Sequence, residues 1–86
     1  MIKIAYTPAF VRQYKKLDRD LQEEVRERIG SFRNKKNHDT LKVHKLHGDL
    51  KKFFSFSVNY KTRIVFYWLT TDEALLEAVG DHEVYR

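Results

Sequence analysis

The segment His44–Phe56, with the sequence HKLHGDLKKFFSF, gathers side chains that can move protons or bind phosphate. It holds two histidines, three lysines and one aspartate immediately before an aromatic stretch. Histidine and carboxylate side chains serve as general acids and bases, and cationic side chains stabilise charge on phosphoryl oxygens. This segment is therefore the first candidate for a functional site.

The positive charge of the chain is concentrated around the same segment. The formal net charge is +5, and residues 33–52 hold seven lysines and arginines against two acids, so that seven minus two equals the whole net charge. These residues are Arg33, Lys35, Lys36, Lys42, Lys45, Lys51 and Lys52, with Asp39 and Asp49 as the acids. A local excess of positive charge predicts a polyanionic ligand, nucleic acid first, whereas the alternative is a solvated basic face.

Three residues outside this segment extend the candidate site. Arg63 lies in the otherwise apolar stretch TRIVFYWLT. Its guanidinium group can hold a phosphate with two parallel hydrogen bonds; alternatively, its stem covers aromatic surface while the charge stays in water. His82 and Tyr85 follow the last predicted strand, and they emerge near Arg63 if that strand is its neighbour. The alternative for both is an ordinary surface side chain.

The histidines do not form a metal-binding pattern. His44 and His47 lack helical i,i+4 spacing and a nearby carboxylate pair, so together with His82 they do not predict a metal site. Cleavage of RNA by its own 2′-hydroxyl group needs only a base, cations and an acid for the 5′ leaving oxygen. The chain carries all these residue types outside its predicted core, and we expect neither a metal nor a cofactor.

A strand and two helices are predicted for the N-terminal part of the chain. Ile2–Tyr6 alternates between apolar and polar residues, as a strand does. Thr7 and Pro8 suit the cap and first position of a helix, and Asp18 suits the cap of a second one. The second helix carries one apolar stripe, formed by Leu21, Val25, Ile29 and Phe32.

From about residue 51 the apolar period changes to two, which predicts three strands within residues 51–58, 62–70 and 74–80. The fold class expected for the single domain 1–86 is α+β. It consists of an N-terminal strand, two antiparallel helices and an antiparallel β-meander. Both helices pack on one sheet face and leave the other face free.

Composition excludes several classes of protein. There is no cysteine, so disulfides and thiolate metal sites are absent, and 42% hydrophobic residues are enough for a folded core. No apolar run has the length of a signal peptide core or a transmembrane span. We therefore expect a cytoplasmic protein without a membrane partner.

Three local patterns resemble those of the RelE/ParE toxin superfamily of type II toxin–antitoxin systems. HKLHGDL (44–50) resembles its H-x-L-x-G-[ED]-L segment, and NYKTRIVFYW (59–68) resembles its strand with tyrosine and arginine. VGDHEVYR (79–86) resembles its C-terminal ending with histidine and tyrosine. The resemblance covers nearly the whole chain and is closest to the RelE-, YoeB- and YafQ-like mRNA interferases.

The resemblance implies a role for each candidate residue in a metal-independent endoribonuclease. The general base is Asp49, His44 or Lys52, a choice that the sequence leaves open. Arg63 holds the scissile phosphate and His82 is the acid. The remaining residues bind or orient RNA, namely Tyr85, Lys42, Lys45, His47 and Lys51.

The resemblance also implies partners. These are a cognate antitoxin, mRNA on the ribosome, and operator DNA only through the antitoxin complex. Two alternatives stay open: a ParE-like inhibitor of DNA gyrase, in which Arg63 and His82 matter little, and a nucleic-acid-binding relative without catalysis.

Overall fold

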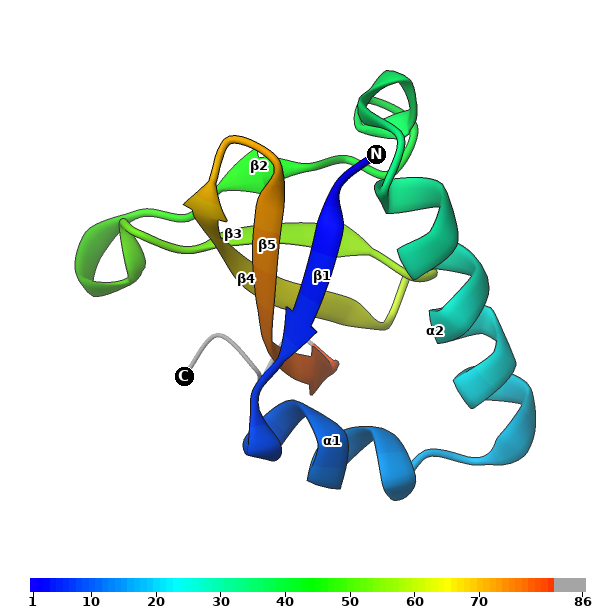
Figure 1. The fold of residues 1–86 in the computed structure, drawn as a ribbon. Coiled ribbons are helices and arrows are strands. Elements are labelled where there is room, and N and C mark those ends of the chain that lie inside the picture. Colours follow the sequence, from blue (N-terminus) through cyan, green and yellow to red (C-terminus); the bar gives the residue numbers. More distant parts are fainter. Residues whose placement is uncertain (82–86) are drawn as a thin grey trace.

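Two capped helices follow a short N-terminal strand in the computed structural model, which describes residues 1–81 (Figure 1). The elements in chain order are β1 (Lys3–Tyr6), α1 (Pro8–Lys15), α2 (Arg19–Phe32), the 3₁₀ helix η1 (Lys35–Asn37), β2 (His44–Lys45), the 3₁₀ helix η2 (Gly48–Leu50), β3 (Phe54–Ser57), β4 (Arg63–Thr70) and β5 (Glu73–Gly80). None of the helices described is long and apolar enough to cross a membrane.

The helix starts confirm the predicted caps. The Thr7 hydroxyl accepts a hydrogen bond from the amide of Phe10 at 3.0 Å, with Pro8 in the first turn of α1. The Asp18 carboxylate accepts from the amide of Leu21 at 2.9 Å. Each cap satisfies a backbone donor that the first helical turn leaves without a partner, and so it fixes where the helix begins.

The sheet has five strands in the order β1-β5-β4-β3-β2. The meander of β3, β4 and β5 is antiparallel, as the sequence predicts, and β2 joins β3 in the same sense. β1 instead pairs with β5 in parallel, so the first and last strands of the described chain are neighbours. The Thr7 hydroxyl reinforces this closure by donating to the carbonyl oxygen of Glu77 at 3.0 Å.

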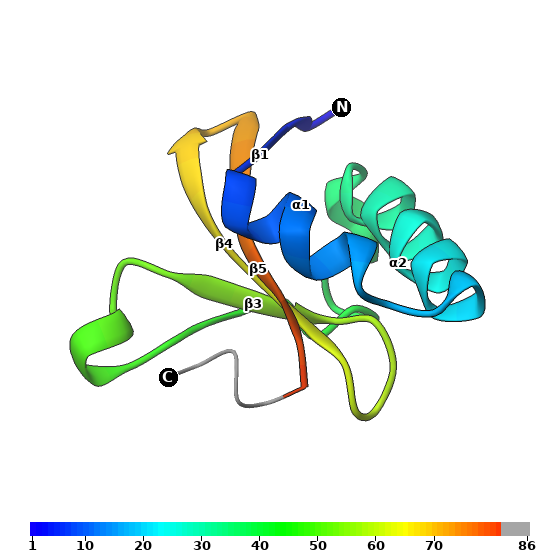
Figure 2. The same ribbon diagram turned by 90° about the horizontal axis from the view of Figure 1, so that it is seen from below.

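Both helices cover the same side of the sheet, and the core lies between these two layers (Figure 2). The stripe on α2 ends in Phe32, whose ring stacks on Phe56 at 4.5 Å and meets Phe66 edge-on at 4.8 Å. Val25 and Ile29 of the same stripe are also buried. This aromatic contact between a helix and two strands fixes the position of α2 on the sheet.

The antiparallel contact expected between the helices is made near their connecting turn. There Gln22 Nε2 donates to the carbonyl oxygen of Tyr14 at 3.0 Å. Beyond this contact the helices spread apart, and the C-terminal end of α2 comes to the start of β1 (Figure 1). The two helices therefore do not form a tight helical hairpin along their whole lengths.

Candidate nucleic-acid interface

Arg63 is placed on the sheet face opposite the helices, as the alternation along its strand predicts. Its neighbour Ile64 is fully buried toward the helices, so Arg63 points to the other face. It pairs with Ser57 of β3 and Gly80 of β5. The middle of this face is not free, contrary to expectation, because Val65 is buried. Arg63 lies at the margin of that face and is half-buried.

The Arg63 side chain is held by the turn that precedes it. Its Nη1 donates to the carbonyl oxygens of Asn59 at 2.6 Å and Thr62 at 3.2 Å. Within residues 1–81, neither Nε nor Nη2 has a hydrogen-bond acceptor. One edge of the guanidinium group is thus fixed by backbone oxygens.

Asn59 shapes this turn, and sequence reasoning did not single it out. Its side-chain oxygen accepts from the amides of Lys61 at 2.9 Å and Thr62 at 2.8 Å, while its Nδ2 donates to Glu24 of α2 at 2.9 Å. The sequence did contain a signal, because an asparagine begins the turn before Arg63. Asparagine stabilises such turns by hydrogen bonds between its side chain and the following backbone.

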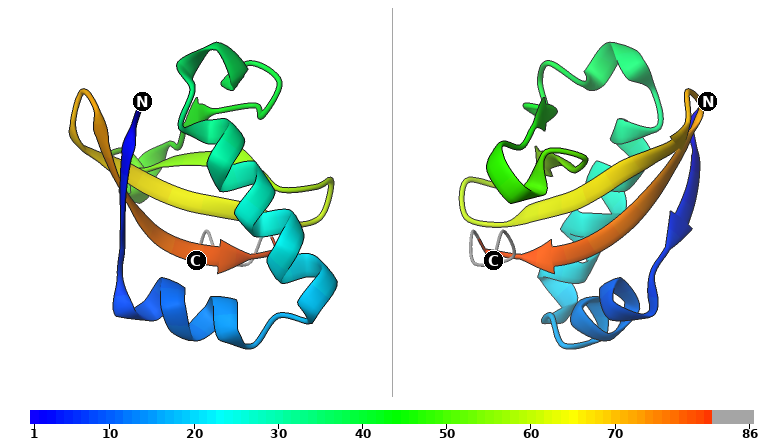
Figure 3. Two further views of the ribbon diagram at one scale, coloured as in Figure 1. Left: turned by 45° about the vertical axis from the view of Figure 1, so that its right-hand side comes forward. Right: turned by 90° about the vertical axis from the view of Figure 1, so that its left-hand side faces the viewer.

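The predicted basic residues lie on and around the β2–β3 hairpin. All of them are exposed, and they are Lys42, His44, Lys45, His47, Lys51 and Lys52. In the right-hand view of Figure 3 this hairpin lies on the opposite side of the molecule from β1, in agreement with the strand order. An exposed cluster of cations on one projecting hairpin provides a local positive field for a polyanion.

His44 faces the same side of the sheet as Arg63. It pairs with Ser55 on β3, and Ser57, two residues further along, pairs with Arg63. Ordinary strand spacing and rise place the two Cα atoms about 12 Å apart. Two long side chains on one face can therefore reach the same phosphodiester from two directions.

A hydrogen bond sets the chemistry of the His44 ring. Its Nδ1 lies 2.8 Å from the carbonyl oxygen of Lys42. A carbonyl oxygen only accepts, so Nδ1 carries the proton, and in the neutral ring Nε2 is left with a lone pair. That is the arrangement that a general base requires.

Asp49 is not brought to Arg63. It lies exposed in η2, which connects β2 to the start of β3, whereas Arg63 pairs with Ser57 at the end of that strand. Figure 1 shows η2 at the far end of the hairpin from the β3–β4 turn. Of these two candidate bases, His44 is the one on the same sheet face as Arg63, and both His44 and Arg63 pair with β3.

Lys52 is positioned by aromatic rings that sequence reasoning left out of the site. Its Nζ lies 5.3 Å from the ring centroid of Phe53 and 5.7 Å from that of Tyr67. These two rings meet edge-on at 5.7 Å. The contact between ammonium and ring faces places Lys52 Nζ beside the rings of Phe53 and Tyr67, while the side chain stays exposed.

The chain leaves the sheet beside Arg63, because Gly80 is its partner on β5. This meets the condition under which His82 and Tyr85 were expected near Arg63, but both residues lie outside the described residues. Within residues 1–81, no three histidine, aspartate or glutamate side chains group as metal ligands would.

Solved structures of bacterial toxins share this fold. A copper-bound mutant toxin from Helicobacter pylori is 23% identical, with full coverage of both chains and a TM-score of 0.72. The YoeB–YefM toxin–antitoxin complex from Staphylococcus aureus gives 19% identity over 95% of this chain and 98% of that chain, with a TM-score of 0.73. The DinJ–YafQ complex from Escherichia coli gives 18% over 98% and 97%, also with a TM-score of 0.73.

No protein-family model and no curated protein matches the sequence. At identities below 25%, the structural similarity establishes the fold. The chain has the α+β fold of the RelE/ParE toxin superfamily, including its YoeB and YafQ types.

Proposed function

We propose that this chain is the toxin of a type II toxin–antitoxin system and that it cleaves mRNA without a metal ion. The observation that carries the proposal is the setting of Arg63. Its guanidinium group is anchored by two backbone oxygens on the face that His44 shares, and within residues 1–81 its Nε and Nη2 have no acceptor. The toxin fold and the exposed cations of the hairpin support the same assignment.

The proposed reaction is an in-line displacement at phosphorus. The base removes the proton of the 2′-hydroxyl group, and the 2′ oxygen attacks the adjacent phosphorus while the bond to the 5′ oxygen breaks. The products are a 2′,3′-cyclic phosphate and a 5′-hydroxyl end, which receives its proton from the acid. Arg63 and the lysines stabilise the charge that develops on the phosphoryl oxygens.

The geometry favours His44 as the base. Its Nε2 is the unprotonated nitrogen of the neutral ring, and the residue lies on the side of the sheet that carries Arg63. Asp49 lies further off in η2, and Lys52 is engaged with two aromatic rings. We assign His82 as the acid and Tyr85 as a residue that stacks on a base, as the family resemblance implies.

An antitoxin is the expected protein partner. Chains of the same fold have been solved as toxin–antitoxin complexes, among them the YoeB–YefM heterotetramer. We further propose that the cytoplasmic substrate is mRNA bound to the ribosome, and that operator DNA is contacted only through the antitoxin complex.

The test is inducible expression of the wild type and of Arg63→Ala in bacteria, with primer extension on abundant mRNAs. The wild type is expected to arrest growth and to produce cuts within translated regions, and Arg63→Ala to do neither. Arg63→Lys, which keeps the charge without the fork of donors, should restore little. Arg19→Ala removes an exposed arginine outside the interface and serves as the control.

Two outcomes would reject the proposal. Growth arrest with intact mRNA and DNA damage, equal in wild type and Arg63→Ala, indicates a gyrase inhibitor. Salt-dependent binding of RNA with no cleavage by the purified wild type or in cells indicates a binding module.

A further inference from the structure

An aromatic pair lies on the sheet face that carries Arg63. Tyr67 follows Arg63 by four residues on β4, and its neighbours Phe66 and Trp68 pack toward the helices, so Tyr67 points to the opposite face. Phe53 directly precedes β3, and its ring meets the ring of Tyr67 edge-on, with 5.7 Å between the centroids. Ordinary strand rise places the Cα atoms of Tyr67 and Arg63 about 13 Å apart.

The hydrophobic core does not use these two rings. The cluster under the helices takes other aromatic residues of β3 and β4, namely Phe54, Phe56 and Phe66. Phe53 and Tyr67 are half-buried, and within residues 1–81 neither ring contacts any aromatic ring except the other. Ring surface is therefore left on a sheet face that no helix covers. Exposed aromatic rings on a sheet are the surface on which single-stranded RNA stacks its bases.

Lys52 adds a cation at the border of this aromatic surface. Its Nζ is within 6 Å of both ring centroids, at 5.3 Å from Phe53 and 5.7 Å from Tyr67. Its side chain is exposed, and it has no ion-pair partner among residues 1–81. Each base of an RNA strand is joined through its sugar to a phosphate, so a base stacked on the rings brings a negative charge toward Lys52.

The charges around the rings favour a nucleotide over a protein segment. An apolar segment would cover the rings, but it would also take the ammonium group of Lys52 out of water without supplying an acid. Lysine is depleted at protein–protein interfaces for this reason. On the same hairpin Lys45 and Lys51 are also exposed, against one acid, Asp49. The occupant that matches both the rings and the cations is a nucleobase that carries its phosphate.

We propose that Phe53 and Tyr67 bind one nucleobase of the RNA by stacking and that Lys52 binds the phosphate of this nucleotide. The stacking site deepens the proposed function and rests on it for its substrate, and it comes in addition to the base contact assigned to Tyr85. The 13 Å between Tyr67 and Arg63 assigns the stacked base to a nucleotide that flanks the cleaved phosphate. Because a purine offers more ring area than a pyrimidine, the site prefers purines and contributes to the choice of cleavage position.

The test uses a short oligo-uridine strand that contains a single 2-aminopurine, a fluorescent purine whose emission falls when it stacks. All sugars carry 2′-O-methyl groups, which remove the attacking hydroxyl, so binding is measured without cleavage. The full-length wild type is expected to quench the fluorescence of the bound probe. It should also bind the probe more tightly than the all-uridine strand, because the probe holds the only purine.

Replacing each ring checks that stacking is the cause. Tyr67→Leu and Phe53→Leu keep an apolar side chain, and each should remove most of the quenching and lower the affinity for the probe about tenfold or more. Tyr67→Phe keeps the ring and should keep both properties. Tyr6→Leu removes another exposed tyrosine, on β1, and is the matched control. Circular dichroism confirms that each variant is folded.

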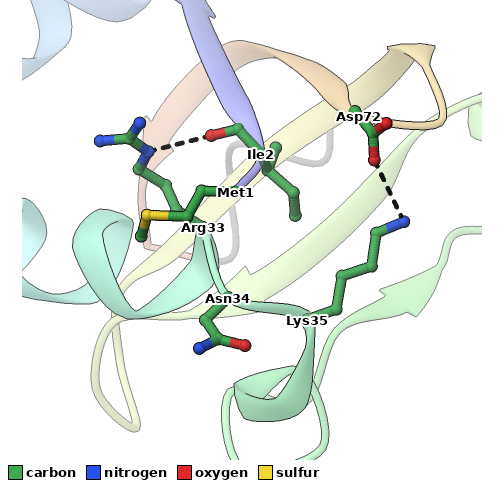
Figure 4. Close-up of a pocket in the computed structure, with 6 residues that line it drawn as sticks. All are labelled: Met1, Ile2, Arg33, Asn34, Lys35 and Asp72. Atoms are coloured by element: carbon green, nitrogen blue, oxygen red, sulfur yellow. Dashed lines mark hydrogen bonds and ion pairs between the residues drawn. The ribbon is translucent and has the colours of Figure 1, made fainter.

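Replacing the lysine separates charge from stacking. Lys52→Met should reduce the salt dependence of probe binding by about 0.7 in the slope, while the quenching at saturating protein stays that of the wild type. Lys35→Met is the control. The Nζ atom of Lys35 lies 3.6 Å from Asp72, in a pocket of about 320 Å³ that Met1 and Ile2 also line (Figure 4).

Three results would overturn the stacking site. They are no quenching by the wild type, equal quenching by folded Tyr67→Leu and Phe53→Leu, and a loss of quenching in Tyr67→Phe. The probe cannot be cut, so the two proposals fail separately. Quenching by a chain that cuts no mRNA in cells would reject the proposed cleavage alone, and cleavage in cells without quenching would reject the stacking site alone.

Discussion

The ring of His44 is hydrogen-bonded at 2.8 Å to the carbonyl oxygen of Lys42, and Lys42 itself adopts a left-handed backbone with φ of 59°. A lysine in this conformation is strained, because its Cβ crowds the backbone. The unusual turn directs a carbonyl oxygen at the histidine two residues later. The strain and the orientation of the proposed base thus belong to one local arrangement.

Replacing His44 separates the two candidate bases. His44→Ala is expected to lower the rate of RNA cleavage about 10²–10⁴-fold, because a general base contributes an effect of that size. Asp49→Ala, in η2, should lower it far less. The measurement is single-turnover cleavage of translated mRNA by purified protein, with circular dichroism to confirm folding. A greater loss for Asp49→Ala would transfer the role of base to the carboxylate.

Replacing Lys42 tests the strain. Lys42→Gly should raise the free energy of unfolding by up to about 1 kcal/mol, because glycine adopts positive φ without the steric cost. Urea denaturation measures this change. Lys45→Gly, in the extended strand β2, is the matched control and should not stabilise the protein. Equal effects of both changes would show that Lys42 is not strained.

Replacing each of two glycines with alanine should change the stability of the fold in opposite directions. A Cβ atom would meet nothing within 4 Å at either Gly30 or Gly48, so side-chain crowding is not the difference between them. Gly30 lies in α2, and Gly30→Ala should stabilise the fold by about 0.5–1 kcal/mol. Gly48 has φ of +68°, and Gly48→Ala should destabilise it by about 1 kcal/mol. Thermal unfolding of the two variants side by side checks the prediction, which two shifts in the same direction would refute.

Asn59→Ala should weaken both stability and catalysis. The change removes two hydrogen bonds inside the turn and one to Glu24, and it should cost about 1–3 kcal/mol. Arg63 would lose the fixed carbonyl oxygens that orient it, so the cleavage rate should fall at temperatures where the variant is folded. Lys61→Ala changes a side chain in the same turn but leaves those hydrogen bonds in place, so this variant should keep wild-type activity. Full activity of folded Asn59→Ala would show that the turn does not position Arg63.

The hairpin lysines should be visible in the salt dependence of RNA binding. Each phosphate contact to single-stranded RNA contributes about 0.7 to the slope of log affinity against log salt concentration. Lys51→Ala combined with Lys52→Ala should therefore reduce the slope by about 1.4. The control pair, Lys15→Ala with Lys16→Ala, lies at the C-terminal end of α1 and should leave the slope unchanged. Fluorescence anisotropy over a range of salt provides the slopes, and equal slopes for both pairs would remove the hairpin from the interface.

Local signals in the sequence predicted the elements that depend on near neighbours. Thr7 and Asp18 marked the helix starts because a cap acts within three residues, and alternation placed Arg63 opposite Ile64. β2 was not predicted, because two exposed, polar residues carry no pattern and form a strand only by pairing with β3. The parallel pairing of β1 with β5 was missed for the same reason, since it joins distant segments.

The candidate site was predicted by residue type more than by arrangement. Arg63 and His44 were singled out from their chemistry, but the bonds that orient them come from Asn59 and Lys42, whose roles depend on turn geometry. The proposed preference for His44 over Asp49 rests on the register of β2 on β3, which no local pattern contains. The aromatic support of Lys52 likewise requires β3 and β4 to lie side by side.

The pairing of β1 with β5 also decides when this protein can fold during its own synthesis. Thr7 and Glu77, which share a hydrogen bond, are separated by 70 positions, and Arg63 meets its partner Gly80 only in the last strand. While the chain is being translated, β1 has no neighbour until β5 has left the exit tunnel, so the sheet closes late. The surroundings of Arg63 therefore stay incomplete in a nascent chain until Gly80 has left the tunnel.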